Sequence, residues 1–124
     1  MNVSIEREIM KEFIRVMKAM SDPNRVRIVK LLQLKELCVC ELQELLGLAQ
    51  STVSKHLKLL DEAGLISNRR EGAWVIYEVN DNGECDHVKS LLREMRGWVE
   101  EDTVYVDMKK RLPFVDRARI SAAS

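Results

Sequence analysis

Apolar residues recur along most of the chain at the three- and four-residue spacing that is typical of amphipathic helices. The first such stripe consists of Ile5, Ile9, Phe13, Met17 and Met20. This spacing predicts a helix over residues 5–20. A second helix follows, because Asp22 can cap a helix N-terminus and Pro23 is tolerated at the first helical position. We expect the second helix to be central, since most of its surface is apolar.

Two shorter helices are predicted next. In residues 36–48 the leucines fall at helical spacing until Gly47 ends the run. In residues 49–65, Val53, Leu57 and Leu60 lie on one helical face, and Gly64 marks the stop. A turn of about three residues would join the two helices, which is the helix-turn-helix arrangement.

The hydrophobic period then changes from helical to alternating. Residues 66–80 are rich in Val, Ile, Tyr and Trp, with Glu71 and Gly72 in the middle. This pattern predicts a β-hairpin in which Gly72 supplies a positive φ at the turn. A hairpin beside a helix-turn-helix is called a wing, so the expected fold is mainly α-helical with one β-hairpin.

The C-terminal part begins with a loop at residues 81–84, after which helical spacing returns over residues 85–99. The apolar positions of that helix are Val88, Leu91, Leu92, Met95, Trp98 and Val99. Residues 102–124 have no clear period and contain Pro113. We therefore expect a domain over residues 1–101 and a loosely ordered tail over 102–124, with a short strand at 103–106.

Composition limits the partners that the chain can have. The 124 residues suit one domain, and 46% of them are hydrophobic. The 20 basic and 20 acidic side chains balance, so a nucleic-acid surface must come from local clustering. No apolar stretch is long enough to span a membrane, and the charged N-terminal residues do not resemble a signal peptide. We expect a cytoplasmic protein with reduced thiols.

The predicted helix over residues 50–63 carries a polar face opposite its apolar stripe. The candidate DNA-binding residues on it are Gln50, Ser51, Thr52, Ser54, Lys55, His56 and Lys58. Such side chains can hydrogen-bond base edges or neutralise phosphates, and Arg69 and Arg70 of the hairpin would add backbone or minor-groove contacts. A solvated helix face is the alternative, but the order helix, turn, helix and Arg-Arg hairpin favours DNA binding.

Four segments resemble the ArsR/SmtB family of bacterial and archaeal metalloregulatory repressors, from about Phe13 to Asn80. They are KAMSDPNRVRIVKLL, ELCVCEL, LGLAQSTVSKHLKLLDEAGLI and RREGAWVIYEVN. The resemblance implies a homodimeric winged helix-turn-helix that binds a palindromic operator. It also implies a dimer interface on the first and last helices, formed here by Ile9, Phe13, Met17, Val88, Leu91, Leu92, Met95 and Trp98. Many relatives have a capping serine where this chain has Ala49.

Cys38 and Cys40 in ELCVCEL are the candidate ligands for an inducer. On a regular helix, residues two apart point about 200° apart, so the two sulfurs converge only if the segment is extended or a helix begins there. A helix N-terminus near Cys40 would also favour the thiolate. The alternative is that both are small core residues. The resemblance instead implies thiolate ligation, which would distort the helix-turn-helix and weaken DNA binding.

The identity of the inducer depends on the remaining ligands. Soft ions prefer sulfur, and arsenic-responsive relatives often have a third cysteine at the position that Gln43 occupies here. The resemblance favours As(III), with Sb(III), Cd(II) and Pb(II) as alternatives. No cysteine precedes Cys38, which argues against a four-thiolate cadmium site. Cys85 could be a third ligand from either protomer, but an isolated thiol is the simpler interpretation.

Other functions are less consistent with the sequence. The zinc-sensing relatives use Asp and His on the last helix, and Asp86 and His87 have no second ligand pair about ten residues later. An enzyme is disfavoured, because the chain has no CxxC, phosphate-binding loop or parallel αβ pattern. A repressor that senses oxidation through its thiols, or one that has lost sensing, remains open.

Overall fold

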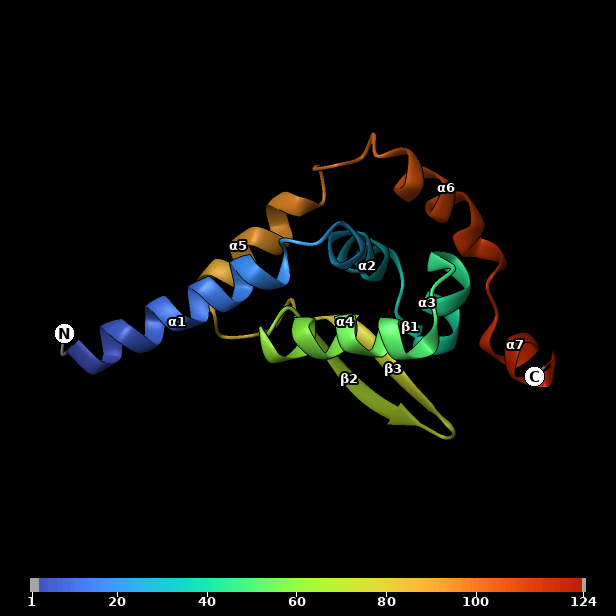
Figure 1. Ribbon diagram of the computed structural model, residues 1–124, viewed down its shortest axis with the longest axis horizontal. Helices are drawn as coiled ribbons and strands as arrows, with labels where there is room; N and C mark the ends of the chain where they lie inside the picture. Colours follow the sequence, from blue (N-terminus) through green and yellow to red (C-terminus); the bar gives the residue numbers. More distant parts are fainter. Residues whose placement is uncertain (1–2, 124) are drawn as a thin grey trace.

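Residues 3–123 are described by the computed structural model, which places helices around a small three-stranded sheet (Figure 1). The elements in chain order are α1 (Val3–Ala19), α2 (Pro23–Leu34), β1 (Leu37–Cys38), α3 (Val39–Leu46), α4 (Gln50–Glu62), β2 (Ile66–Glu71), β3 (Trp74–Val79), α5 (Asp86–Met95), α6 (Thr103–Arg111), the 3₁₀ helix η1 (Leu112–Phe114) and α7 (Arg117–Ala123). Helices α3 and α4 form the predicted helix-turn-helix. None of the described helices has the length and apolar character needed to cross a membrane.

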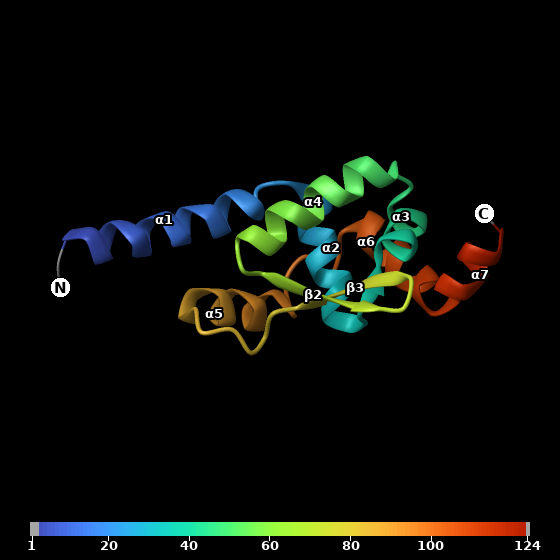
Figure 2. The ribbon, with the colours of Figure 1, turned by 90° about the horizontal axis from the view of Figure 1, so that it is seen from below.

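One hydrophobic core joins the helices to the sheet. Its fully buried side chains include Ile28, Leu31, Leu42, Leu57 and Leu92, from four different helices. Helix α2 supplies several of them and lies centrally between α1, α3 and α6, as its apolar sequence predicted (Figures 1 and 2). The core therefore fixes α3 and α4 relative to the central helix.

The caps at two helix N-termini differ as the sequence suggested. Asp22 caps α2, since its Oδ1 accepts hydrogen bonds from the amides of Asn24 at 2.8 Å and Arg25 at 3.1 Å. Ala49 occupies the N-cap position of α4 and provides no side-chain hydrogen bond. Ser51 does not replace the missing cap, because it lies within the first turn of α4. The first turn of α4 thus keeps amide groups that no capping side chain satisfies.

The wing is confirmed and has a third strand that the sequence pattern did not reveal. Strands β2 and β3 pair antiparallel from Ile66–Val79 to Glu71–Trp74, and Gly72 takes φ +61° in the two-residue turn. Strand β1 adds to the other edge of β3, where Leu37 pairs with Tyr77. Two residues give no recognisable period, so pattern analysis could not predict this strand.

Helix α5 is shorter than predicted. It ends at Met95, where the Lys30 ammonium donates hydrogen bonds to the carbonyls of Met95 at 2.9 Å and Arg96 at 3.3 Å. The chain then turns through Val99, a non-glycine residue with φ +57°. Trp98 therefore lies outside the helix, although helical spacing had assigned it to the helical stripe.

The burial of α5 also changes the predicted dimer interface. Val88, Leu92 and Met95 are at most 2% exposed and form part of the protomer core, so their assignment to the interface stays a prediction that the protomer's surface does not support. A side chain that the protomer already buries has no surface left for a partner. Leu91 is half-buried and Trp98 is exposed, so these two keep solvent-accessible surface.

The C-terminal arm, defined here as residues 102–123, is helical. The short strand predicted at residues 103–106 is wrong, because these residues begin helix α6. Asp102 starts this helix: its Oδ2 accepts a hydrogen bond from the Tyr105 amide at 2.9 Å. The same carboxylate forms a two-pronged pair with Arg27 of α2, at 2.8 and 3.1 Å. Tyr105 and Met108 are buried, which attaches the arm to the core.

Asp102→Ala is expected to lower the free energy of unfolding by about 2–3 kcal/mol, because it removes a helix cap and leaves the partly buried Arg27 without its carboxylate. The bonds from Arg27 and the Tyr105 amide lower the pKa of Asp102. Its stabilisation is therefore present above about pH 4 and is lost as the pH falls through the lowered folded-state pKa. Urea denaturation at pH 7 and pH 3 measures both effects.

Asp107→Ala is the matched control for that substitution. Asp107 also pairs with an arginine, Arg111, at 2.9 Å, but both side chains are exposed. We expect its removal to change the free energy of unfolding by less than about 0.5 kcal/mol. Equal effects of the two substitutions would show that Asp102 does not anchor the arm.

Candidate functional site: a DNA-reading face and a thiol pair

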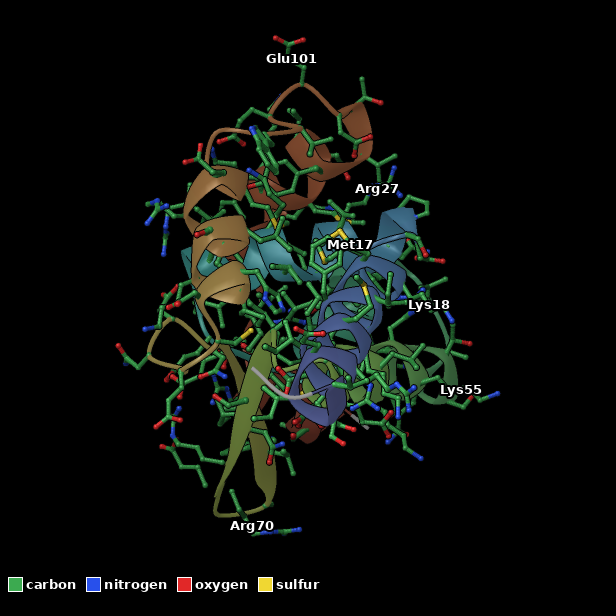
Figure 3. All side chains as sticks on the ribbon, turned by 90° about the vertical axis from the view of Figure 1, so that its left-hand side faces the viewer. Met17, Lys18, Arg27, Lys55, Arg70 and Glu101 are labelled. Carbon is green, nitrogen blue, oxygen red and sulfur yellow. The ribbon has the colours of Figure 1, made fainter. Side chains whose placement is uncertain are left out.

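Helix α4 has the two faces that its sequence predicted. Val53, Leu57 and Leu60 are fully buried, and α4 packs against α2, α3 and the wing. The opposite face exposes Gln50, Ser51, Thr52, Ser54, Lys55 and Lys58. Figure 3 shows Lys55 projecting outward from this face. Polar groups at the start of the helix and two ammonium groups along it are therefore available to a partner.

His56 differs from the other residues predicted for this face. It is half-buried, and its Nδ1 lies 3.3 Å from a terminal nitrogen of Arg25 in α2. The Nε of Arg25 donates to the carbonyl of Ala19, at the end of α1, at 2.7 Å. His56 thus belongs to a polar junction of three helices. Its ring contacts this junction and is less exposed than the other residues predicted for the face, and its contact with DNA stays a prediction.

The two arginines of the wing have different environments. The Arg69 guanidinium donates to both carboxylate oxygens of Glu36, at 2.8 and 2.7 Å, and to Glu71 at 3.1 Å. The Glu36 carboxylate, followed by that of Glu71, raises the pKa of Arg69. Arg70 is exposed and extends from the wing in Figure 3. Arg69 therefore braces the wing against the segment after α2, and Arg70 is the arginine that reaches outward.

A basic flank on α1 was missed by the sequence analysis. Lys11, Arg15 and Lys18 line a pocket of about 520 Å³ together with Leu59 of α4. Lys18 lies on the same side of the molecule as Lys55 (Figure 3). The signal was present in the sequence, because basic residues at 11, 15 and 18 have helical spacing. This flank extends the positive surface beyond the helix-turn-helix.

Cys38 and Cys40 converge at the junction of β1 and α3. Cys38 ends the strand as the N-cap of α3, Cys40 lies in the first helical turn, and their Sγ atoms are 2.8 Å apart. Both conditions that the sequence left open are met at once, since the chain is extended up to Cys38 and helical after it. Cys38 is 2% exposed and Cys40 is half-buried, so access to the pair is from the side of Cys40.

Glu41 organises the thiol pair from within α3. Its carboxylate is buried, accepts a hydrogen bond from the Cys38 amide at 2.9 Å, and pairs with Arg117 of α7 at 3.1 Å. Burial raises the pKa of the Cys38 thiol to about 12, with the Cys40 hydrogen bond and Glu41 adding to the effect. Cys38 is thus a thiol at neutral pH. The thiolate that a helix N-terminus favours is not found at this residue.

Two contacts connect the thiol pair to the DNA-reading elements. Cys38 pairs with Ile76 of β3, and Ile76 pairs on its other side with Arg69 of β2. Helix α3, which carries Cys40, packs directly against α4. Cys38 therefore lies on a strand that pairs with the wing, and Cys40 lies on a helix that packs against α4.

Cys85 is not brought to the pair within one protomer. It precedes α5, where its Sγ lies 3.1 Å from Nε2 of His87, whose ring meets Phe13 of α1 edge-on at 5.7 Å. Helices α3 and α5 lie toward opposite ends of the molecule (Figure 2). Among residues 3–123, no three His, Cys, Asp or Glu side chains gather into a group that could hold a metal ion. The protomer therefore supplies two sulfurs at one site.

Comparisons with known proteins give consistent results. Residues 22–68 match the family described as "Bacterial regulatory protein, arsR family". The chain is 36% identical over 88 residues to the "Arsenical resistance operon repressor" of Bacillus subtilis, covering 70% of this chain and 80% of that protein. It is 40% identical over 81 residues to the "Cadmium resistance transcriptional regulatory protein CadC homolog" of Staphylococcus aureus, covering 64% of each.

The fold is also found in a solved structure. The homodimeric winged helix-turn-helix DNA-binding domain of a possible ArsR-family regulator from Mycobacterium bovis matches with a TM-score of 0.65 and 25% identity. The match covers 77% of this chain and 85% of that one. The sequence identity to the curated relatives and the match to a winged helix-turn-helix structure agree with each other. The chain therefore belongs to the ArsR/SmtB family of DNA-binding transcriptional repressors, which are not enzymes.

Proposed function

We propose that the protein is a cytoplasmic homodimeric repressor that releases a palindromic operator when a soft metal or metalloid ion binds Cys38 and Cys40. Arsenite is the inducer that we favour. The observation that carries the proposal is a pair of sulfurs 2.8 Å apart. Cys38 lies on a strand that pairs with β3 of the wing, and Cys40 lies on a helix that packs against α4. Thiolates select soft ions such as As(III), Sb(III), Cd(II) and Pb(II) over hard ones.

In the proposed DNA complex, α4 enters the major groove. Gln50, Ser51, Thr52 and Ser54 at its start read base edges, since the N-terminal residues of a recognition helix contact the bases. Lys55 and Lys58 neutralise phosphates, and Lys18 on the α1 flank extends these contacts along the backbone. His56 acts through its contact with Arg25, by holding α4 in place.

Dimerisation would present two such helices to two half-sites. The α1 stripe supports it, because Ile9, Phe13 and Met17 are 47%, 41% and 39% exposed and form a continuous apolar surface along the helix. The M. bovis relative, described as homodimeric, supports the same arrangement. The interface would thus use α1, with Leu91 and Trp98 near the α5 end.

Release follows from the position of the thiols. An ion that binds both sulfurs must displace the proton of Cys38 and replace the S–H···S hydrogen bond by two metal–sulfur bonds. Because Cys38 is both the last residue of β1 and the N-cap of α3, the adjustment moves the start of α3. A coupling of about 1–3 kcal/mol between ion and DNA would weaken operator binding by about 5- to 150-fold.

The test is operator release followed by fluorescence anisotropy, after the operator has been isolated by selection from random-sequence duplexes. Reduced protein is titrated with As(III), Sb(III), Cd(II), Pb(II), Zn(II) and peroxide in parallel. Release by arsenite at the lowest concentration is the expected result. Release by Cd(II), Pb(II) or Zn(II) alone would identify that ion, and not arsenite, as the inducer. Release by peroxide alone would make the protein a redox sensor, and no release by any of them would contradict sensing.

Arg70→Ala is expected to weaken operator binding about tenfold and to reduce the slope of log K against log salt by about one. Arg70 is exposed at the wing, so its loss removes one phosphate contact without disturbing the fold. Arg69→Ala is the matched neighbour, and it should lower the slope less, because its guanidinium is engaged by Glu36 and Glu71. Anisotropy from 50 to 300 mM salt measures both. An unchanged slope for Arg70→Ala would exclude it from the interface.

A further inference from the structure

The pocket between α1 and α4 lies apart from the thiol pair. Its volume of about 520 Å³ is in the range of pockets that hold small molecules. The lining comes from α1, α2 and α4 and contains no cysteine. The C-terminal half of α1 runs beside the C-terminal end of α4 here, whereas α3 lies toward the other end of the molecule (Figures 1 and 2). A ligand in this pocket would touch the recognition helix without touching the thiols.

One part of the lining is apolar. Met10 and Ile14 contribute to it from successive turns of α1, and Leu59 contributes from α4. These side chains are between 41% and 59% exposed, so the protomer leaves them in water. Met10 and Ile14 each follow a residue of the apolar stripe, Ile9 and Phe13, and stand about 100° further round the helix. A dimer formed along the stripe would therefore use a different face of α1.

The rest of the lining is mainly cationic. It includes four basic side chains and one carboxylate, which are Lys11, Arg15, Lys18, Arg25 and Glu62. Glu62 already has Lys58 as a partner, at 4.0 Å. Among residues 3–123, no carboxylate lies within ion-pair distance of Arg15 or Lys18. Uncompensated positive charge thus stands directly beside the apolar surface.

Arg25 is held in a fixed position at this site. Its Nε donates to the carbonyl of Ala19 at 2.7 Å, and a terminal nitrogen donates to the carbonyl of Lys18 at 3.3 Å. The other terminal nitrogen lies 3.3 Å from Nδ1 of His56. A guanidinium has five N–H groups, so these three contacts leave two of them for a ligand. Little side-chain entropy remains to be lost when an anion binds.

This lining favours an occupant that has two chemically different parts. An apolar body is stabilised when it leaves water against Met10, Ile14 and Leu59. A carboxylate or similar head group is stabilised by the guanidinium and ammonium groups beside them. A DNA phosphate would use only the cationic part and would leave the apolar part in water. The combination therefore fits an amphipathic small anion better than it fits a nucleic-acid backbone.

We propose that the pocket between α1 and α4 is a binding site for a soluble organic anion with an apolar body and one anionic head group, and that its occupation weakens operator binding. The effect on DNA rests on the proposed function, to which this site adds a second effector. Binding is noncovalent. The head group would engage Lys18, which contacts the DNA backbone in the proposed complex, so ligand and phosphate would compete for the same ammonium group.

Octanoate is the probe for this site, and its binding to the reduced full chain is measured by isothermal titration calorimetry without DNA. Acetate supplies the head group alone and 1-octanol supplies an uncharged body. Both are expected to bind at least about tenfold more weakly than octanoate. No binding of octanoate, or equal binding of octanoate and 1-octanol, would overturn the inference. Co-sedimentation with phosphatidylglycerol vesicles without octanoate binding would also overturn it, and would assign the surface to a membrane.

Two substitutions test the two parts of the lining. Leu59→Ser should raise the Kd for octanoate about fivefold, and Arg15→Gln should raise it about threefold. Leu34→Ser and Arg93→Gln are the matched controls, because both side chains are exposed and neither lines this pocket. The controls should bind octanoate as the wild type does. Wild-type affinity in both Leu59→Ser and Arg15→Gln would refute the assignment.

The effect on DNA is measured by operator anisotropy at saturating octanoate. Operator binding should weaken at least about threefold, and the slope of log K against log salt should fall by about one, because a phosphate contact is lost. The Cys38→Ser/Cys40→Ser variant should respond to octanoate as the wild type does. Unchanged operator affinity would overturn the effector role. A failure of every soft ion to release the operator would instead contradict only the proposed function, since octanoate binding is measured without DNA.

Discussion

Replacement of both Cys38 and Cys40 by serine is expected to abolish operator release by arsenite at any concentration that leaves the protein folded. The two hydroxyls retain the mutual hydrogen bond that the thiols make at 2.8 Å, so the buried Cys38 position keeps a polar partner. Serine is not deprotonated near neutral pH and offers no soft donor. Operator affinity without inducer should stay within about twofold of wild type, because neither residue lies on the exposed face of α4.

Cys85→Ser is the control for this experiment. Its thiol is 3.1 Å from His87 at the other end of the molecule, and it makes no group with the pair within the protomer. The response should therefore survive this substitution. If Cys85→Ser abolished release, the third ligand would come from α5 of one protomer or its partner. Full release by the Cys38→Ser/Cys40→Ser variant would refute the thiol site.

The hydrophobic pattern predicted most of the fold because its period is long and strong. Helices α1 and α4 have stripes extending over three turns, and the wing alternates over a dozen residues. The hydrophobic pattern predicts less where a helix or strand is short. Strand β1 has two residues, and its existence depends on pairing with β3, which no local period records. The link between Cys38 and the wing was therefore visible only in three dimensions.

Helix boundaries at α5 and α6 show a second limit of sequence analysis. Trp98 fits the helical stripe of α5, but the helix stops at Met95, where Lys30, distant in sequence, donates hydrogen bonds to the carbonyls of Met95 and Arg96. Helix α6 contains β-branched residues that suggested a strand, but Asp102 caps it and Arg27 holds the cap. Tertiary contacts decide both cases, and intrinsic propensity is too small to oppose them.

The candidate site was also predicted only in part from the sequence. The spacing of Cys38 and Cys40 identified the candidate ligands, but only the structure places Cys38 in the core, raises the pKa of its thiol and adds Glu41 beside it. The sequence also treated Arg69 and Arg70 as equivalent. Their difference arises from Glu36, 33 residues before Arg69, which engages one arginine and leaves the other exposed.

Ile9→Glu is expected to produce a monomer and to weaken operator binding by roughly 100-fold or more, since two linked half-sites bind far more tightly than one. Ile9 is 47% exposed in the protomer and belongs to the α1 stripe, so a carboxylate there would lose its hydration on dimerisation. The protomer itself should remain folded, because the side chain is not part of the core. Sedimentation velocity and operator anisotropy measure the two effects.

Glu8→Gln is the matched control on the same helix. It also changes the charge by one unit, but Glu8 lies off the apolar stripe with its side chain 69% exposed beside Lys11. This variant should remain dimeric with wild-type affinity. The salt dependence adds an independent measure, because a monomer that contacts one half-site should give about half the wild-type slope. An Ile9→Glu protein that stays dimeric, or a monomer that keeps full affinity and slope, would show that α1 does not join the two recognition helices.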